Sequence, residues 1–312
     1  MVFAHQERYR SDDGLAVLGP EPTELVRQLD ETFREWALCD GAQPMTAPAL
    51  LPVGMLAKLD VYANFPHMAL VAGRLRLEDG GSLAAQAADG EFPPESLHAA
   101  ALALPSTVCY GVYAAYSGTT VEDTAVTLVG QCFRNEEHYD GLRRLRSFRM
   151  REVVALGSAE SARDHLDRYS TLIGEFAKEL GLPLDRVAAA DPFYDRAGSR
   201  ALLQSLLAVK HEFVYRGMAV ASVNEHRNFF GERCAIAQPS GAAAFSSCVG
   251  FGFERWVSAL IEHFAGDWDA AIHAVARTRA GVGLPGPAAD AGPNTSQGTP
   301  AVLGAADPEK RE

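Results

Sequence analysis

The residues best equipped for chemistry lie in one charged stretch, residues 131–154. Apolar residues stand at both of its ends, and six arginines lie between them around Phe148. A guanidinium group donates a planar fork of hydrogen bonds that matches phosphate oxygens, and it also stacks on aromatic rings. The composition therefore favours a phosphate-binding pocket in which Phe148 stacks a base. The alternative is a solvated hairpin at the edge of a sheet.

Two arginines, Arg134 and Arg255, stand inside apolar strings from distant parts of the chain. Arg255 follows Gly250 and Gly252, and glycines let a backbone or a ligand approach closely. A Gly-x-Gly pair alone is only weak evidence for a nucleotide-binding loop. Buried ion pairs are the alternative for both arginines: Arg134 with Glu136 or Glu152, and Arg255 with Glu254.

These residues need elements to position them, and the hydrophobic pattern predicts an α/β chain. Apolar residues at three- and four-residue steps predict helices over 21–38 and 158–180. Ser158 is the expected N-cap of the second helix, and Gly181 its end. The charged stretch is expected to form a strand, a loop and a second strand. Further strands are predicted in several segments: 43–48 (an interrupted edge strand), 68–77, 102–113 (broken by Pro105), 202–217 (as a central strand) and the residues after 219.

Composition limits the class of protein. The 312 residues are 47% hydrophobic, enough for one large domain with a buried core, which we place at residues 1–279. Residues 280–312 are dominated by Gly, Pro, Ala, Thr and Ser and are predicted to form a disordered, low-complexity tail. A net charge of −12 makes the chain a poor electrostatic match for nucleic acid.

The sequence also predicts where the protein works. It contains no apolar run of about 18 residues that would predict a membrane span. Its first eight residues lack the basic and then apolar pattern of a secretion signal. The five cysteines are widely spaced and do not suggest a disulfide framework. We therefore expect a cytoplasmic protein.

Several strings together resemble a known family. Phe-Arg-x-Glu at 133–136, followed by Phe-Arg-Met-Arg-Glu at 148–152, resembles motif 2 of the class II aminoacyl-tRNA synthetases. The string Cys-Val-Gly-Phe-Gly-Phe-Glu-Arg at 248–255 resembles their motif 3, and residues 21–48 resemble motif 1, which forms their dimer interface. Phe-Pro-His at 65–67 and Asp-Pro-Phe-Tyr at 191–194 are similar to strings of the amino acid:[carrier protein] ligases, shortened homologues of atypical seryl-tRNA synthetases.

The resemblance covers about residues 10–265 and carries an expectation for the fold. It implies a class II aminoacyl-tRNA synthetase-like core, in which an antiparallel β-sheet of six or seven strands is flanked by helices. It also implies a homodimer.

The resemblance further implies an ATP site that uses Mg²⁺. Arg134 would contact the α-phosphate and Arg255 the γ-phosphate, so both are expected to be catalytic. Glu136 would accept a hydrogen bond from the adenine amino group, and Phe148 would stack on the ring. Three carboxylates are candidates for the Mg²⁺ ligand that precedes motif 3: Glu212, Glu225 and Glu232.

A zinc site is implied as well, with Cys109, Glu152 and Cys248 as ligands. Two thiolates and a carboxylate suit Zn²⁺, and three protein ligands leave one position open. In the atypical seryl enzymes this position takes the amino group of the amino acid, and here Asn224 and His226 are expected in the same substrate pocket. The alternative is that both cysteines are packing residues and Glu152 is a surface charge.

The residues after Cys109 are expected to form a wall of the substrate pocket: Tyr110, Gly111 and Val112. The family segment has proline where this chain has Gly111. This difference leaves the shape of the pocket and the choice of amino acid open.

The implied activity is ATP-dependent activation of a small α-amino acid to an aminoacyl-adenylate, followed by transfer to the phosphopantetheine thiol of a carrier protein. A seryl-tRNA synthetase needs a helical arm before motif 1. Motif 1 begins here near residue 21, so tRNA is not expected as a partner. Two alternatives stay open: the adenylate could pass to a protein amine, a small-molecule amine or tRNA, or the chain could be a non-catalytic paralogue that senses amino acid or ATP.

Overall fold

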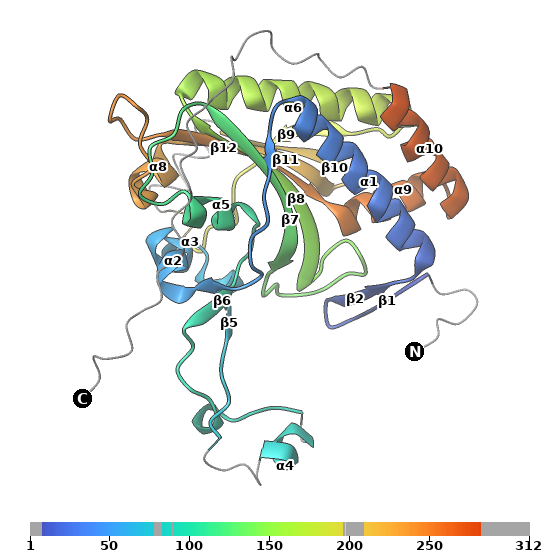
Figure 1. Cartoon of the computed structure of the whole chain (residues 1–312). Coiled ribbons are helices and arrows are strands. Elements are labelled where there is room, and N and C mark those ends of the chain that lie inside the picture. Colours follow the sequence, from blue (N-terminus) through green and yellow to red (C-terminus); the bar gives the residue numbers. More distant parts are fainter. Residues whose placement is uncertain (1–7, 78–82, 89, 196, 198–208, 282–312) are drawn as a thin grey trace.

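One large sheet, in which most neighbouring strands are antiparallel, forms the centre of the molecule (Figure 1). The computed structural model describes residues 8–77, 83–88, 90–195, 197 and 209–281, and within them this sheet has nine strands. They are β1 (Tyr9–Asp12), β2 (Leu15–Leu18), β3 (Gln43–Pro44), β7 (Thr124–Phe133), β8 (Ser147–Gly157), β9 (Asp185–Ala188), β10 (Lys210–Tyr215), β11 (Met218–Arg227) and β12 (Phe245–Gly252).

The order of neighbouring strands is β3, β7, β8, β12, β11, β10 and β9. Only the β3–β7 pair in this series is parallel. The hairpin of β1 and β2 attaches to the start of β8 through a single parallel pairing. The predicted antiparallel sheet is therefore confirmed, and the hairpin adds two strands to the expected number.

One face of the sheet carries long helices over an aromatic core. They are α1 (Pro20–Cys39), α6 (Ala159–Leu180), α9 (Phe253–His263) and α10 (Trp268–Gly281). Phe33 of α1 stacks on Phe251 of β12 with ring centroids 4.1 Å apart. The ends predicted for α6 are confirmed, because the Ser158 side chain accepts the Ser161 N–H and Gly181 ends the helix with a φ of 68°.

The opposite face carries shorter helices. They are α2 (Val53–Lys58), α3 (Val61–Asn64), α5 (Cys109–Ala115) and α8 (Phe229–Cys234), with a 3₁₀ turn η1 (Pro66–Met68) between α3 and β5 (Leu70–Ala72). Successive residues of a strand point to opposite faces. In β8, Val153 joins the core under the long helices and Val154 joins the core under the short ones. Glu152 therefore faces the side of the short helices.

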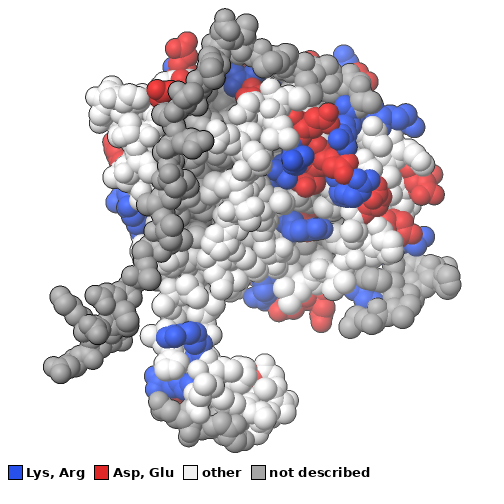
Figure 2. All heavy atoms as spheres, viewed as in Figure 1, with Lys and Arg blue, Asp and Glu red and all other residues white. Residues whose placement is uncertain are grey.

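A small lobe projects from this side of the molecule (Figure 1). It begins at a three-stranded sheet in which β6 (Leu102–Leu104) lies between β4 (Leu51–Pro52) and β5. Two short elements lie further out: α4 (Leu83–Ala88) and η2 (Pro94–Ser96). On the face drawn in Figure 2, acidic and basic side chains of the body are intermixed and not separated into patches of one sign.

Several predicted strands were wrong in extent or position. The strand predicted over 102–113 ends with β6, since Pro105 has no N–H to continue a ladder, and Cys109 instead begins α5. The strand predicted over 68–77 shrinks to β5. The strand predicted over 202–217 is not central, because β10 lies beside the edge strand β9; residues 202–208 lie outside the described part.

The end of the described chain also differs from the prediction. Helix α10 continues to Gly281, so residues 280 and 281 belong to a helix and not to the predicted tail. The remainder of that tail, residues 282–312, lies outside the described residues. Among the described helices, none combines the length and the apolar character that a bilayer span requires.

Candidate active site

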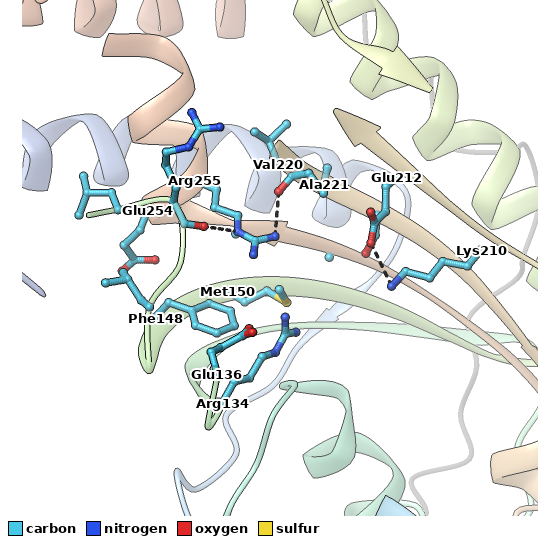
Figure 3. Close-up of a pocket in the computed structure, with 17 residues that line it drawn as sticks. Arg134, Glu136, Phe148, Met150, Lys210, Glu212, Val220, Ala221, Glu254 and Arg255 are labelled. Atoms are coloured by element: carbon cyan, nitrogen blue, oxygen red, sulfur yellow. Dashed lines mark hydrogen bonds and ion pairs between the residues drawn. The ribbon is translucent and has the colours of Figure 1, made fainter. Parts of the chain in front are cut away.

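The structure brings Arg134 and Arg255 to one cavity. Arg134 directly follows β7, and Arg255 lies in the first turn of α9. Both line a cavity of about 80 Å³ together with Phe148 and Glu136. Figure 3 shows both guanidinium groups pointing into this space, with Phe148 beside Arg134. The Cζ atom of Arg134 lies 4.9 Å from the centroid of the Phe148 ring.

Both guanidinium groups are held by backbone carbonyls. Arg134 Nε donates to Ser106 O at 3.2 Å. Arg255 donates from Nε to Arg143 O at 2.9 Å and from a terminal nitrogen to Ala219 O at 3.2 Å. Within the described part of the chain, neither group forms an ion pair with a carboxylate. The buried ion pairs considered as the alternative are therefore absent there.

The carboxylates at this cavity are paired with other cations. Their partners are as follows: Glu136 with Arg144 at 3.2 Å, Glu254 with Arg149 at 3.5 Å, and Glu212 with Lys210 at 3.1 Å. Burial, and next the charge of Arg134, lower the pKa of Arg255 to about 10, so Arg255 is still a cation at neutral pH. Two cations without a carboxylate partner suit an anion with many oxygens, such as a triphosphate.

Two of the five remaining arginines of the charged stretch have partners away from this cavity. Arg146 pairs with Asp13 at 2.8 Å. Arg151 is buried on the side of the long helices, where it pairs with Asp30 of α1 at 2.6 Å. Alternation along β8 explains this, because Arg151 faces away from the cavity that Phe148 lines. Arg146 and Arg151 are therefore not among the residues that line this cavity.

A second cluster joins Cys109, Glu152 and Cys248. One ligand atom from each lies within 4.8 Å of the others, and all three side chains are buried. They come from the first turn of α5, from β8 and from β12, whose Gly250 is paired with Glu152. Glu152 is 1% exposed and is not a surface charge. Two thiols and a carboxylate at this spacing fit Zn²⁺.

The start of α5 orients Glu152. The Thr107 hydroxyl donates a short hydrogen bond to one carboxylate oxygen, and the Val108 N–H donates to the same oxygen at 3.2 Å. The Cys109 N–H donates to the other oxygen at 2.7 Å. Burial raises the pKa of Glu152 to about 7. The hydrogen bonds therefore position the carboxyl group, and a bound cation would favour its ionised form.

The two thiols differ in acidity. Burial raises the pKa of Cys109, whereas the hydrogen bond that Cys109 donates lowers the pKa of Cys248. Asn224 Nδ2 and His226 Nε2 lie 3.5 and 3.7 Å from Cys248 Sγ. The pair thus favours a thiolate at Cys248, and a thiolate is the form that binds a metal.

The two clusters lie at adjoining cavities. Cys109, Glu152 and Cys248 line a larger cavity of about 520 Å³, as do Asn224 and His226. Five residues line both cavities: Arg134, Met150, Lys210, Ser222 and Gly250. A Cβ atom at Gly250 would lie only 3.3 Å from Met150 Sδ, so the glycine keeps this shared wall thin.

The wall predicted after Cys109 is only partly correct. Tyr110 lines the larger cavity, but Gly111 and Val112 are not among the described lining residues. A Cβ atom at Gly111 would lie 2.5 Å from Ala47 Cβ, so this glycine permits close packing and does not shape the pocket.

Sequence reasoning missed residues that contact the members of the Cys109–Glu152–Cys248 cluster or their neighbours. Thr107 bonds to Glu152, and Tyr113 Oη lies 2.9 Å from His226 Nδ1. Neither has a sequence signal, because each acts through another residue. Of the candidate Mg²⁺ ligands, Glu212 lines the smaller cavity with Arg255, whereas Glu225 and Glu232 line the larger one.

The chain is similar to amino acid–[acyl-carrier-protein] ligases and, over a shorter stretch, to serine–tRNA ligases. No protein-family model matches it. Amino acid–[acyl-carrier-protein] ligase 2 of Bradyrhizobium diazoefficiens is 33% identical over 193 residues, and the match spans 57% of this chain and 57% of that protein. Ligase 1 of the same organism is 30% identical over 245 residues, or 74% of each protein. The type-2 serine–tRNA ligase of Methanococcus aeolicus is 27% identical over 143 residues, which are 41% of this chain and 27% of that protein.

Solved structures identify the fold. The seryl-tRNA synthetase of M. kandleri, in complex with tRNASec of A. aeolicus, matches with a TM-score of 0.72 and 20% identity, over 89% of this chain and 60% of that one. Prolyl-tRNA synthetase of Cryptosporidium parvum matches with a TM-score of 0.61 and 13% identity, over 82% and 50%. The predicted class II synthetase core is confirmed. With 30% identity over 74% of ligase 1, the chain belongs to the amino acid–[acyl-carrier-protein] ligase family.

Proposed function

We propose that this chain uses ATP to convert a small α-amino acid into an aminoacyl-adenylate and then transfers the aminoacyl group to the phosphopantetheine thiol of a carrier protein. One observation carries the proposal: the cluster of Cys109, Glu152 and Cys248 adjoins the cavity that holds Arg134 and Arg255. A site for a free amine and a site for a triphosphate thus share a wall.

In the first step, a carboxylate oxygen of the amino acid attacks the α-phosphorus of ATP, and the bond to pyrophosphate breaks. Negative charge builds on the α-phosphate oxygens, where Arg134 would stabilise it. Arg255 would hold the γ-phosphate. Phe148 would stack on the adenine, and Glu136 would accept a hydrogen bond from its amino group.

Cys109, Glu152 and Cys248 would hold Zn²⁺, which, when bound, supplies an open position for the neutral α-amine of the amino acid. The amine site fixes one end of the substrate, so the carboxylate can be oriented toward Arg134. Asn224, beside Cys248, is the proposed side-chain contact to the substrate.

Glu212 is the proposed Mg²⁺ ligand because it lines the cavity of Arg255. Mg²⁺ in nucleotide sites is commonly held by one or two carboxylates together with phosphate oxygens. Its salt bridge to Lys210, at 3.1 Å, orients the Glu212 carboxylate.

In the second step, the pantetheine thiol loses its proton, its sulfur attacks the carbonyl carbon, and the bond to AMP breaks. The names of the two Bradyrhizobium ligases support a carrier protein as the acceptor. A cytoplasmic location is part of the proposal, since the unpaired thiols of Cys109 and Cys248 need a reducing compartment.

The first step is tested by ATP–pyrophosphate exchange with each amino acid in turn. We expect exchange with one or a few small amino acids, and loss of exchange and of bound zinc in Cys248→Ser. A purified protein that exchanges with no amino acid would instead favour the non-catalytic paralogue.

The second step is tested by offering labelled amino acid to several acceptors. These are a carrier protein with its pantetheine arm, the same protein without the arm, bulk tRNA and a small-molecule amine. We expect a thioester on the first acceptor alone, identified by mass spectrometry. Exchange activity with label on a different acceptor would keep the adenylation step and replace the carrier.

We also propose that the catalytic domain, predicted to end at residue 279, ends with α10 at residue 281 and acts without the remaining residues. Every proposed site residue lies between residues 109 and 255, and Arg279 of α10 is held by Glu35 of α1 at 2.6 Å. A chain that ends at residue 281 is expected to retain the exchange activity of the full chain. Loss of exchange in a folded, shortened protein would refute this division.

A further inference from the structure

Tyr113 and His226 form a row of side chains that ends at Cys248, one member of the cluster of Cys109, Glu152 and Cys248. Tyr113 Oη lies 2.9 Å from His226 Nδ1, and His226 Nε2 lies 3.7 Å from Cys248 Sγ. Tyr113 is fully buried in α5, and Cys248 is 4% exposed in β12. The row therefore connects the helix that begins with Cys109 to the strand that carries Cys248.

We propose that His226 is a positioning residue that fixes the Cys248 thiolate for metal binding, and that Tyr113 in turn fixes His226. This inference rests on the proposed function, because the metal is the one that would bind the substrate amine. It replaces the expected role of His226 as a substrate contact.

The direction of the hydrogen bonds follows from the chemistry of the thiolate. A metal-bound thiolate has no proton, so it can only accept the contact from His226. A neutral imidazole has one N–H donor and one acceptor nitrogen. With Nε2 donating to Cys248, Nδ1 must accept. The Tyr113 hydroxyl is the donor within reach, and Nδ1 at 2.9 Å is a closer acceptor for its single proton than Ser246 Oγ at 3.5 Å. Tyr113 thus selects the tautomer that serves Cys248.

The rings in this row are held in place by packing. Phe230 of α8 stacks on Tyr113 with centroids 3.9 Å apart and planes 18° from parallel. The same Phe230 meets the His226 ring edge-on, with centroids 4.8 Å apart. Phe230 therefore packs against both Tyr113 and His226, and this packing restricts rotation of the imidazole away from Cys248.

His226 acts through Cys248 and not as a ligand. In the described part of the chain, the group whose ligand atoms lie close enough to share an ion consists of Cys109, Glu152 and Cys248, without His226. Asn224 Nδ2, at 3.5 Å from Cys248 Sγ, is a second donor to the same sulfur. Loss of such outer partners typically lowers metal affinity by about 10- to 100-fold.

The test uses the purified full chain, stripped of metal and titrated with Co²⁺ without amino acid or ATP. Affinity is measured by chelator competition, and the thiolate-to-cobalt absorption band reports on the sulfur ligands. His226→Asn removes the donor near Cys248, whereas His226→Gln places an amide nitrogen near the position of Nε2. Tyr113→Phe removes the supporting hydroxyl. Tyr116→Phe is its matched control, since no hydrogen bond of the Tyr116 hydroxyl is found among the described residues.

We expect His226→Asn to weaken Co²⁺ binding by about 10- to 100-fold and to shift the absorption band, with a smaller loss in Tyr113→Phe. His226→Gln should recover most of the affinity, and Tyr116→Phe should match the unaltered protein. ATP affinity, measured in parallel, should stay unchanged in all four variants.

Two results would overturn the inference. One is an unchanged affinity and spectrum in His226→Asn and Tyr113→Phe. The other is complete loss of binding in His226→Asn, as in Cys248→Ser, which would make His226 a ligand. If His226→Asn does not fold, the comparison of Tyr113→Phe with Tyr116→Phe decides. If the unaltered protein binds no Co²⁺, the proposed metal site itself fails, which is a different outcome from failure of the row alone.

Discussion

At the scale of single residues, the carboxylates and the arginines of the site have different kinds of partner. Glu136, Glu212 and Glu254 each have a cation beside them, whereas Arg134 and Arg255 bind backbone carbonyls. A carbonyl orients a guanidinium group without neutralising it. Both arginines therefore keep their charge for a ligand, and this is the physical basis for assigning them to the phosphates.

Arg134 and Arg255 can be tested by conservative replacement. Arg134→Lys and Arg255→Lys keep the charge but lose the planar fork, so we expect ATP–pyrophosphate exchange to fall by about 100- to 1,000-fold. Arg146→Lys is the matched control, because Arg146 lies in the same loop as Arg134, between β7 and β8, but pairs with Asp13. Equal losses in all three variants would show a general loop effect and no specific phosphate contact.

Because burial raises the pKa of Glu152, we expect the stability of the protein to depend on pH. Burial raises its pKa from 4.5 to about 7, so the fold disfavours the charged form. In the metal-free protein this penalty is absent below about pH 4.5, grows as the pH rises toward 7, and is complete above it. The penalty is on the order of 3 kcal/mol when complete. Glu152→Gln should therefore gain stability relative to the unaltered chain as the pH rises.

The measurement is urea unfolding of both metal-free proteins at pH 5 and pH 8. The difference between the two proteins isolates Glu152 from other buried groups, such as His165, whose pKa burial lowers to about 3. A difference in unfolding free energy that is the same at both pH values would contradict the prediction.

At the scale of elements, α5 fixes the geometry of the cluster of Cys109, Glu152 and Cys248, the proposed metal site. Its first residue is Cys109, and the N–H groups of Cys109 and of the N-cap residue Val108 hold Glu152. Gly111 lets this helix approach the segment after β3, where Ala47 lies. A shift of α5 would therefore move a ligand and the donors to a second ligand at once.

Gly111→Ala tests this dependence. The added methyl group would lie 2.5 Å from Ala47 Cβ, so we expect a loss of stability of about 1–3 kcal/mol and weaker zinc binding. The double variant Ala47→Gly with Gly111→Ala removes the clash and should recover zinc affinity. Thermal unfolding and zinc competition measure the two effects. A double variant no better than Gly111→Ala would mean that the clash with Ala47 is not the cause.

At the scale of the whole molecule, the assembly is a prediction from the motif 1 segment, α1 and β3. Apolar side chains are exposed in the small sheet and directly before it: Val71 at 52%, Leu102 at 37% and Leu50, which precedes β4, at 38%. Apolar surface of this kind favours association between proteins when it is contiguous.

We expect a homodimer in solution. The chain mass is 33.5 kDa, so light scattering on the purified protein should give twice this value across a range of concentrations. A mass measured by light scattering that stays at 33.5 kDa at high protein concentration would refute the dimer without affecting the active-site assignment.

The sequence by itself determined the family, the class II core and the types of residue at the site. Motif strings specify these features because phosphate and zinc each require particular side chains, and those side chains stand within short, recognisable stretches. The helices α1 and α6 were also predictable, since an apolar stripe with a period of 3.6 residues and a capping serine are local properties.

Only the tertiary structure decided which groups meet. It placed Arg151 on the face of the sheet that the long helices cover, and it brought Arg255 and Arg134 to the same cavity. It also connected Tyr113 to Cys248 through His226. It also showed that Gly111 serves packing and not the pocket. Burial, ion pairing and the partners of a metal ligand depend on contacts between segments far apart in the chain, and no local pattern encodes such contacts.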